Sequence, residues 1–405
     1  MAEGLRGGVL EVVEEVIGLA EERVRGLMRP ISGGRMERVG FVDGSYALEE
    51  RRGVCVLALS AATVVVSGDR LEGVMAGSRR PLITLMAPKT YGESRASLLM
   101  STLEIVAARN LVGRGVEAVF MDGSYVSEMM APFGYARDAY ERLTASGSQP
   151  DWSLVEEVGE RSARSFEGVI ENGGEPCSVM AALLRAIMGE ADALYRELGA
   201  QFPDRRWRKE ALDFAVVYVE MTAYLTALKA LLEAAEREGI GVFWVAKDAE
   251  SRYVVEREGV VGWLNDLTLL DYAWREGENV YTALEGVRFG RPRWRVAWER
   301  LLGEVYGRWG DYGVVYFKLA RRGAVMQMTY PSRVAQDRVL DALQTLSTLS
   351  DHHGYPRPLS YVHHIAVLDP GLPRIIADEL YRKARSPLLR SMLAPSGRVM
   401  LGLRW

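Results

Sequence analysis

The chain carries one six-residue motif twice, and this repeat limits the fold more than any other feature of the sequence. Residues 41–46 read Phe-Val-Asp-Gly-Ser-Tyr and residues 120–125 read Phe-Met-Asp-Gly-Ser-Tyr, each after an apolar run typical of a β-strand. Glycine lets the backbone leave a strand with positive φ, so we expect Asp43 and Asp122 at strand ends. If these strands are parallel neighbours about 4.8 Å apart, both carboxylates can hold one cation.

A single Asp-Gly pair usually marks only a turn, but two copies in one frame favour a shared cation site. Glu104 is the expected third carboxylate, because small residues such as Ser101 and Ala108 on its helical face would let the helix approach the sheet. Glu93 competes with it, yet Thr90 and Glu93 match a capping box that already explains this glutamate. Three carboxylates suit two hard cations, Mn²⁺ or Mg²⁺, arranged for phosphodiester hydrolysis.

All four histidines lie in one C-terminal stretch, as the pairs His352-His353 and His363-His364. The second pair follows Pro358, which is suited to the first turn of a helix. A histidine beside the carboxylates could bind a metal ion or transfer a proton, and the doublet leaves open which of the two would act. A structural role is the competing interpretation.

Several basic residues are candidate contacts for a nucleic-acid backbone, although each could equally be an ordinary surface residue. Lys247 ends the predicted strand 241–246, where it would bind a substrate phosphate. Arg321 and Arg322 lie in the predicted hairpin turn between strands 314–319 and 324–329. Weaker candidates in the helical region are Arg205, Arg206, Arg208 and Lys209.

The periodicity of apolar residues predicts an α/β fold with a mixed sheet flanked by helices and a large helical insertion. The expected strands include 38–43, 53–67, 82–86 and 116–121, in addition to those named above. We divide the chain into an N-terminal helix (1–35), a first half of the core (36–137), a helical insertion (138–240), and a second half with a C-terminal tail (241–405).

Composition and the lengths of the apolar runs argue against a uniformly basic, a disulfide-rich or a membrane-spanning protein. With 48% hydrophobic residues the 405-residue chain can bury a large core, and its net charge of −4 confines any affinity for nucleic acid to a local patch. Two cysteines, Cys55 and Cys177, provide no disulfide framework, which favours a cytoplasmic location. Apolar runs such as 54–66 are short for a membrane helix, and residues 1–4 do not begin a signal peptide.

Taken in order, these motifs resemble the NurA family of archaeal nucleases. The matching pieces are Phe41-Val-Asp43-Gly-Ser, the helix with Glu104, Phe120-Met-Asp122-Gly-Ser, the strand ending at Lys247 with Ser251 after it, and Gly354-Tyr355-Pro-x-Pro-Leu with His363. The resemblance implies an RNase H-like core. It also implies that Asp43, Glu104, Asp122 and His363 bind metal and that Tyr355 is a further active-site residue.

The same resemblance implies a Mn²⁺-dependent homodimer that degrades single- and double-stranded DNA with 5′-to-3′ exonuclease activity. It further implies a role in DNA end resection beside the hexameric ATPase HerA. The apolar tail 400–405 and the N-terminal helix are candidate dimer or partner surfaces.

Two other functions compete with the nuclease. Actin-like ATPases and sugar kinases also use Asp-Gly at strand ends, but Gly33-Gly34 and Gly173-Gly174 are poorly placed for their phosphate loops. A non-catalytic DNA-binding subunit of a helicase complex is the other alternative. The acidic trio argues against it, because carboxylates without metal would repel DNA.

Overall fold

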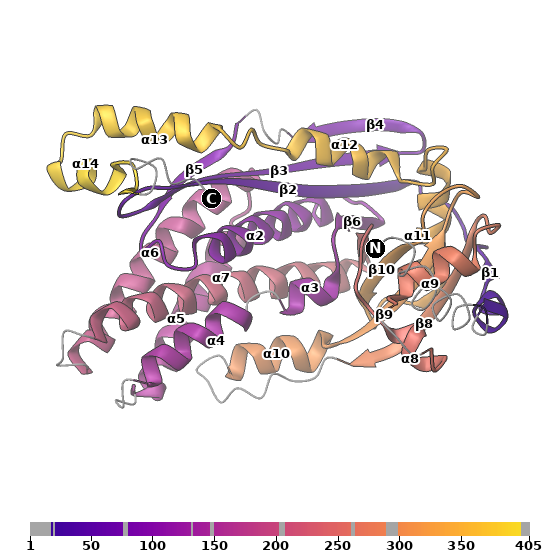
Figure 1. The fold of residues 1–405 in the computed structure, drawn as a ribbon, viewed down its shortest axis with the longest axis horizontal. Helices are drawn as coiled ribbons and strands as arrows, with labels where there is room; N and C mark the ends of the chain where they lie inside the picture. The colour runs from indigo at the N-terminus through magenta and orange to yellow at the C-terminus, as the bar shows by residue number, and fades with distance from the viewer. Residues whose placement is uncertain are drawn as a thin grey trace, which may run out of the picture.

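The computed structural model is built around one ten-stranded mixed sheet (Figure 1). It describes residues 18, 21–75, 80–130, 133–145, 150–201, 207–260, 264–288 and 299–397. The strand order is β1-β8-β9-β10-β7-β6-β2-β3-β4, and β5 pairs separately with β3. Strands β2, β6 and β7 are parallel neighbours, and every other pair in the described sheet is antiparallel.

The strand bounds are β1 Arg29–Pro30, β2 Arg38–Glu50, β3 Cys55–Ser67, β4 Arg70–Met75, β5 Leu82–Met86, β6 Ala118–Asp122, β7 Gly241–Ala246, β8 Val280–Arg288, β9 Asp311–Lys318 and β10 Met326–Pro331. The sequence-based strands are confirmed at β3, β5, β6, β7 and the β9–β10 hairpin, whereas β1, β4 and β8 were not predicted. One expectation is wrong: β2 does not end at Asp43 but continues for seven more residues, because it pairs with β3 along its whole length.

One face of the sheet is covered by α2 and, outside it, a layer of long helices (Figure 1). The helices before β7 are α2 Gly92–Val112, α3 Tyr125–Met130, α4 Phe133–Thr144, α5 Trp152–Glu171, α6 Pro176–Gln201 and α7 Arg208–Glu238. Helices α5, α6 and α7 occupy most of the region predicted as a helical insertion. The division of the chain into the four predicted segments stays a prediction.

Helix α7 is long and apolar enough to cross a membrane by composition alone. However, 89% of its most apolar window is buried inside the fold, where it packs against α2, α5 and α6. This burial is typical of the central helix of a helical layer.

The other face of the sheet is covered by α11, α12 and α13, whereas the other helices that directly follow β7, α8 to α10, pack into the core on the α2 side (Figure 1). After β7 come α8 Tyr253–Arg257, α9 Asp266–Ala273, α10 Glu299–Trp309, α11 Gln336–Leu349, α12 Arg357–Ala366, α13 Leu372–Lys383 and α14 Pro387–Leu393. Helices α12 and α13 lie over β2 and β3. The buried guanidinium of Arg51, beyond the end of β2, pairs with Asp378 of α13 at 2.8 Å and so fastens the C-terminal helices to the sheet.

A row of phenylalanines fixes the register of the three parallel strands. Phe41 of β2, Phe120 of β6 and Phe243 of β7 are opposite one another, and all three are fully buried. Their rings are stacked, with centroids 5.1 Å apart for the first pair and 5.5 Å for the second. Side chains alternate along a strand, so residues 43 and 122 lie on the same face as this stack, two residues further along.

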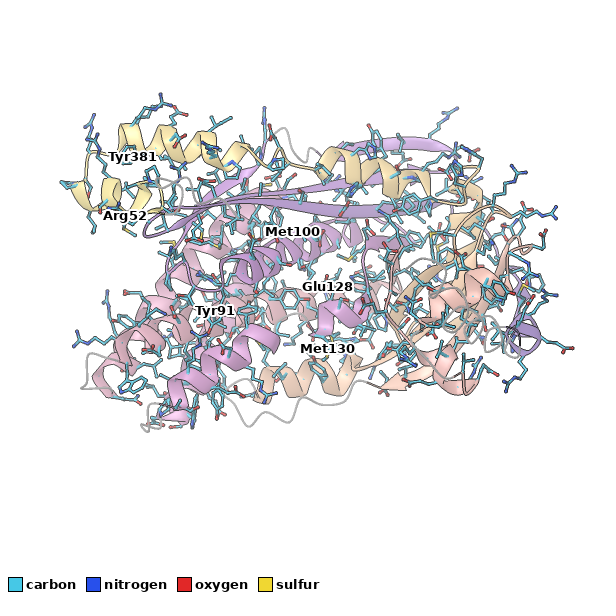
Figure 2. All side chains as sticks on the ribbon, in the orientation of Figure 1. Arg52, Tyr91, Met100, Glu128, Met130 and Tyr381 are labelled. Atoms are coloured by element: carbon cyan, nitrogen blue, oxygen red, sulfur yellow. The ribbon has the colours of Figure 1, made fainter. Side chains whose placement is uncertain are left out.

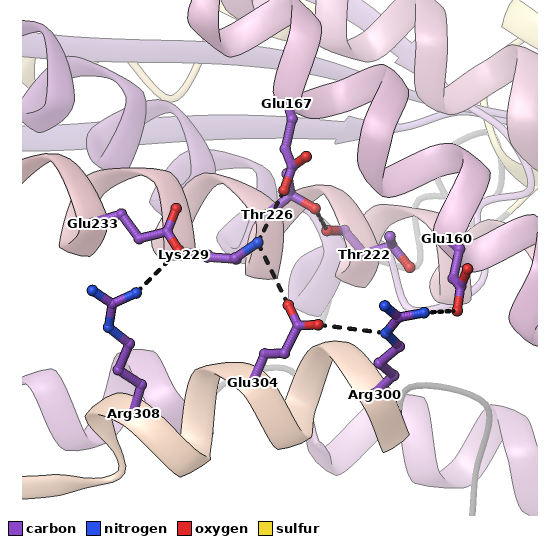
Figure 3. Close-up of polar contacts among 9 residues, drawn as sticks. All are labelled: Glu160, Glu167, Thr222, Thr226, Lys229, Glu233, Arg300, Glu304 and Arg308. Atoms are coloured by element: carbon purple, nitrogen blue, oxygen red, sulfur yellow. Dashed lines mark hydrogen bonds and ion pairs between the residues drawn. The ribbon is translucent and has the colours of Figure 1, made fainter.

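Ion pairs connect α10 to α5 and α7 of the neighbouring helical layer (Figure 3). Lys229 of α7 lies between Glu167 and Glu304, and Arg300 of α10 pairs with Glu160. Pairs that are this exposed each contribute only about 0–1 kcal/mol to stability. The network therefore orients α10 more than it stabilises the fold.

Candidate metal centre

The two copies of the motif meet where the parallel strands β2 and β6 run side by side. The ladder pairs Phe41 with Phe120 and Val42 with Met121, so the next residues, Asp43 and Asp122, are opposite each other. Asp43, Asp122 and His363 each offer a ligand atom, and these atoms all lie within 4.8 Å of one another. The predicted pairing of two aspartates from parallel neighbouring strands is thus seen in the structure.

The histidine doublet is divided by the geometry of α12. The Nδ1 atom of His363 is 2.7 Å from the Oδ2 atom of Asp43. The Nδ1 atom of His364 is instead 2.8 Å from the carbonyl oxygen of Ser360 in its own helix. Only His363 of the pair therefore faces the carboxylates.

Glu104 reaches the site from α2, on the opposite face of the sheet from α12. It is buried, with 6% of its surface exposed, and its side chain lies against Gly44. A Cβ atom on residue 44 would be 2.7 Å from Cγ of Glu104, so any larger residue would displace the glutamate. Glycine is needed here for the close approach of a side chain, and not for a positive φ as the sequence suggested.

The predicted capping box is wrong. Helix α2 begins at Gly92, and its N-cap is Tyr91 in the left-handed conformation without a side-chain cap. Glu93 accepts a hydrogen bond from the Tyr46 hydroxyl at 3.1 Å. This carboxylate is therefore engaged outside the cluster, which leaves Glu104 as the carboxylate that α2 presents to the two aspartates.

The carboxylates are packed so closely that their negative forms are disfavoured. Burial, followed by the charge of Asp122, raises the pKa of Asp43, and this outweighs the opposing effect of His363. Burial also raises the pKa of Glu104 well above its ordinary value, with further contributions from Glu128 and Asp43. A cation bound between these carboxylates would offset their mutual repulsion and favour their ionised forms.

Lys247 supplies a positive charge at the end of β7. Its ammonium donates a hydrogen bond to Oδ2 of Asp122 at 2.9 Å and lies 4.8 Å from the ring centroid of Tyr355. Burial opposes the charged form of Lys247, but its neighbours Tyr355 and Asp122 outweigh burial and keep its pKa above the ordinary value. Burial raises the pKa of Tyr355 itself to about 12, so its hydroxyl keeps its proton at neutral pH.

Ser251, four residues beyond Lys247, lies in a buried polar cluster. Its hydroxyl is 2.8 Å from the Tyr316 hydroxyl and accepts a hydrogen bond from the Gln327 amide at 2.8 Å. The chain between Lys247 and α8 is therefore anchored to β9 and β10. Ser251 supports the lysine loop, and no contact brings it to the carboxylates.

The arginine candidates lie outside the cluster. Arg321 and Arg322 are exposed in the β9–β10 turn, at the same edge of the sheet as Lys247 but on strands further from β6. Arg321 pairs with Glu276. Arg208 and Lys209 begin α7, where Lys209 pairs with Asp213, while Arg205, Arg206 and the tail 400–405 lie outside the described residues.

Sequence reasoning missed Glu128, a half-buried carboxylate on α3 whose charge contributes to the raised pKa of Glu104. Its Oε2 atom accepts a hydrogen bond from the Tyr224 hydroxyl at 2.6 Å. The only signal in the sequence was its position six residues after Asp122, in a helix too short to show an amphipathic pattern.

The donor set fits a divalent cation with mixed oxygen and nitrogen ligands. Carboxylates suit Mg²⁺ and Mn²⁺, and an imidazole among them favours Mn²⁺ over the harder Mg²⁺. Asp43, Asp122 and His363 would hold the ion, and Glu104 is placed to join them.

The fold and the cluster define an α/β protein with a candidate cation site on a mixed sheet. The family model of the NurA domain matches residues 37–368, so the chain belongs to the NurA family. Among curated proteins no match was found.

Solved structures agree with the family model. The chain is similar to the structure of the NurA nuclease from Sulfolobus solfataricus, with 17% identity, a TM-score of 0.57, and 93% of this chain and 94% of that chain covered. It is also similar to a NurA structure with dAMP and manganese, at 15% identity and TM-score 0.68, with 94% and 96% covered. A NurA structure with manganese gives 13% identity and TM-score 0.64, with 93% and 97% covered. The predicted RNase H-like mixed sheet flanked by helices is thereby confirmed.

Proposed function

We propose that this chain is a Mn²⁺-dependent nuclease that hydrolyses phosphodiester bonds in DNA. The observation that carries the proposal is the meeting of Asp43, Asp122 and His363 within 4.8 Å, with the buried Glu104 beside them. Relatives of the same fold are described as a nuclease and as binding manganese and dAMP, which supports this choice of metal and substrate.

The residues divide into groups that hold the cation and groups that handle the substrate. Asp43, Glu104, Asp122 and His363 would hold one or two ions, Mn²⁺ or Mg²⁺, which supply an activated water and charge stabilisation for in-line attack at phosphorus. Lys247 lies at the rim of the cluster with part of its side chain exposed, so its ammonium is placed to bind a substrate phosphate. The Tyr355 hydroxyl, protonated at neutral pH, can donate a hydrogen bond to a phosphate oxygen.

The wider role follows the family resemblance. We propose 5′-to-3′ exonuclease activity with single-strand endonuclease activity, in DNA end resection during double-strand break repair in the cytoplasm. The chain would act as a homodimer beside a HerA-type hexameric ATPase. Arg321 and Arg322 would contact the DNA backbone further from the bond that is cut.

An end-labelled DNA assay tests the proposal. Single- and double-stranded DNA is incubated with the protein and Mn²⁺, Mg²⁺ or EDTA, and with the variants Asp43→Ala and Asp122→Ala. Shortening of the DNA that needs metal and is lost in both variants supports the nuclease. ATP hydrolysis with intact DNA would instead indicate the actin- or sugar-kinase-like alternative, and binding without cleavage the non-catalytic subunit.

A further inference from the structure

Glu128 is a second carboxylate on the α2 side of the site, and it is half-buried. Helix α3 begins three residues after Asp122, and the Glu128 backbone N–H donates to the carbonyl of Ser124 at 3.0 Å. Figure 2 labels Glu128 on α3. The second copy of the motif thus places Asp122 and Glu128 in one short segment.

The carboxylate of Glu128 is fixed from two sides. The Tyr224 hydroxyl of α7 donates to Oε2 at 2.6 Å, and the Ser101 hydroxyl of α2 lies 3.5 Å from Oε1. Tyr224 is fully buried, so this anchor cannot readily move. Within the described part of the chain, no lysine or arginine forms an ion pair with Glu128.

Glu104 is the charged group that Glu128 affects most directly. Ser101, which touches Glu128, is three residues before Glu104 and therefore on the same face of α2. Of the charges around Glu104, that of Glu128 raises its pKa most. Two neighbouring carboxylates disfavour each other's charged forms unless a cation lies near both.

Packing alone does not explain a carboxylate at this position. A tyrosine hydroxyl and a serine hydroxyl need only a neutral acceptor, which glutamine would supply without the desolvation cost of a charge. The negative charge becomes favourable only if it acts on a cation, and the nearest candidate cation site is the one that Glu104 faces.

We propose that Glu128 is a positioning residue of the cation site. With a cation bound, the negative Glu128 carboxylate directs that of Glu104 toward Gly44, Asp43 and Asp122, and it strengthens cation binding without contacting the substrate. This inference rests on the proposed function, because it assumes that the site binds Mn²⁺.

Mn²⁺ binding measured without DNA tests the inference. Free Mn²⁺ is followed by electron paramagnetic resonance while wild type, Glu128→Gln, Glu128→Asp and Glu190→Gln are titrated with the metal. Glu190→Gln is the matched control, because Glu190 on α6 also accepts a hydrogen bond from a serine hydroxyl, that of Ser162 at 3.3 Å, far from the site.

We expect the dissociation constant for Mn²⁺ to rise about tenfold in Glu128→Gln, since residues supporting metal ligands commonly contribute 10–100-fold. Glu128→Asp keeps the charge and should lose about threefold or less, and the control should match wild type.

The outcomes separate this inference from the proposed function. Wild-type affinity in Glu128→Gln, or an equal loss in Glu128→Asp and Glu128→Gln, would overturn a role for the charge. If Glu128→Gln does not fold, Tyr224→Phe decides: it removes the hydrogen bond that fixes the Glu128 carboxylate, so wild-type Mn²⁺ affinity in that variant would overturn the proposal. Mn²⁺ binding that depends on Glu128 but accompanies no DNA cleavage would leave the inference standing and overturn the nuclease. A wild type that binds no Mn²⁺ overturns both.

Discussion

The two copies of the Phe-x-Asp-Gly-Ser-Tyr motif have nearly the same sequence but different structures. In the first copy, residues 41–46, the strand β2 continues through Asp43 and Gly44 to Glu50. In the second copy, residues 120–125, the strand β6 ends at Asp122 and Gly123 turns the chain with φ +113°. Tyr46 remains in a strand, whereas Tyr125 begins α3 and is fully buried.

The difference teaches that the motif specifies the aspartate but not the path of the chain after it. The first copy is held by a thirteen-residue ladder to β3, which carries the strand past the glycine. In the second copy the Tyr125 backbone N–H donates to the Thr329 hydroxyl at 2.8 Å, and its own hydroxyl donates to the Trp309 carbonyl at 2.7 Å, so tertiary contacts draw the chain away from the sheet. The partners of each aspartate follow from this: Asp43 meets His363 and Glu104, and Asp122 meets Lys247.

The largest expected effect concerns His363, the histidine that lies within hydrogen-bond distance of Asp43 in the first copy. His363→Ala should lower the rate of DNA cleavage about a hundredfold, roughly 2.7 kcal/mol of lost transition-state stabilisation, because it removes a group that touches Asp43. His364→Ala should stay within about twofold of wild type, since its ring bonds to its own helix. Initial rates on labelled DNA in Mn²⁺ measure both. Equal losses in the two variants would contradict the separation of the doublet by α12.

Substituting the two glycines should distinguish the two chain paths. Gly44→Ala places a Cβ atom 2.7 Å from Cγ of Glu104, so we expect Mn²⁺ affinity and cleavage to fall about tenfold with little change in stability. Gly123→Ala has open space around its Cβ atom but a strained backbone, so its free energy of unfolding should fall by about 1–3 kcal/mol.

Urea denaturation and Mn²⁺ titration of both glycine variants provide the measurements. Gly134→Ala, with open space and an ordinary φ in α4, is the control. If Gly44→Ala proved the less stable variant and Gly123→Ala the poorer metal binder, the assigned roles of the two glycines would be exchanged.

Much of this site could be predicted from the sequence, for identifiable physical reasons. Apolar runs ending at Asp122 and Lys247 have the period and length of buried strands. The repeated motif suggested that the strands of Asp43 and Asp122 are parallel neighbours, as the structure shows. The register could not be predicted, because it depends on the stacking of Phe41, Phe120 and Phe243, which only the assembled sheet reveals.

Other features depend on tertiary contacts and left no local signal. The continuation of β2 beyond Asp43 comes from its pairing with β3, and polar residues such as Glu285 obscured the strand β8 in residues 280–288. Glu128 resembled a surface residue, since its partial burial accompanies contacts of this six-residue helix with Ser101 of α2 and Tyr224 of α7.

Lys247 tests the second copy of the motif, with a smaller expected effect. Lys247→Met keeps the length of the side chain and removes the charge that pairs with Asp122. We expect KM for DNA to rise about tenfold at low salt, and by less as salt screens the remaining contacts. Lys383→Met is the control, because this exposed lysine of α13 pairs with Glu379 in its own helix. An unchanged KM with a lower kcat would assign Lys247 to the chemical step instead.

The smallest expected effect is on the stability of the metal-free protein, where the two aspartates should differ in sign. Burial and then Asp122 raise the pKa of Asp43 in the folded state, so its contribution to stability is fully present below its unfolded pKa of about 4 and is lost as pH rises through the folded value. Asp43→Asn should therefore raise the melting temperature at pH 7 in EDTA by a few degrees, and change it little at pH 4.

Asp122→Asn should not stabilise the metal-free protein, because it removes the negative charge that pairs with Lys247. Thermal melts of both variants at pH 4 and pH 7, with EDTA or with Mn²⁺, decide the point. Saturating Mn²⁺ should reverse the ranking, since a ligand that binds only the folded state stabilises wild type more than a variant with a weakened site. If Asp43→Asn is destabilised at pH 7 in EDTA, its carboxylate is already compensated by His363 within the protein, and the first copy would not need a cation to be stable.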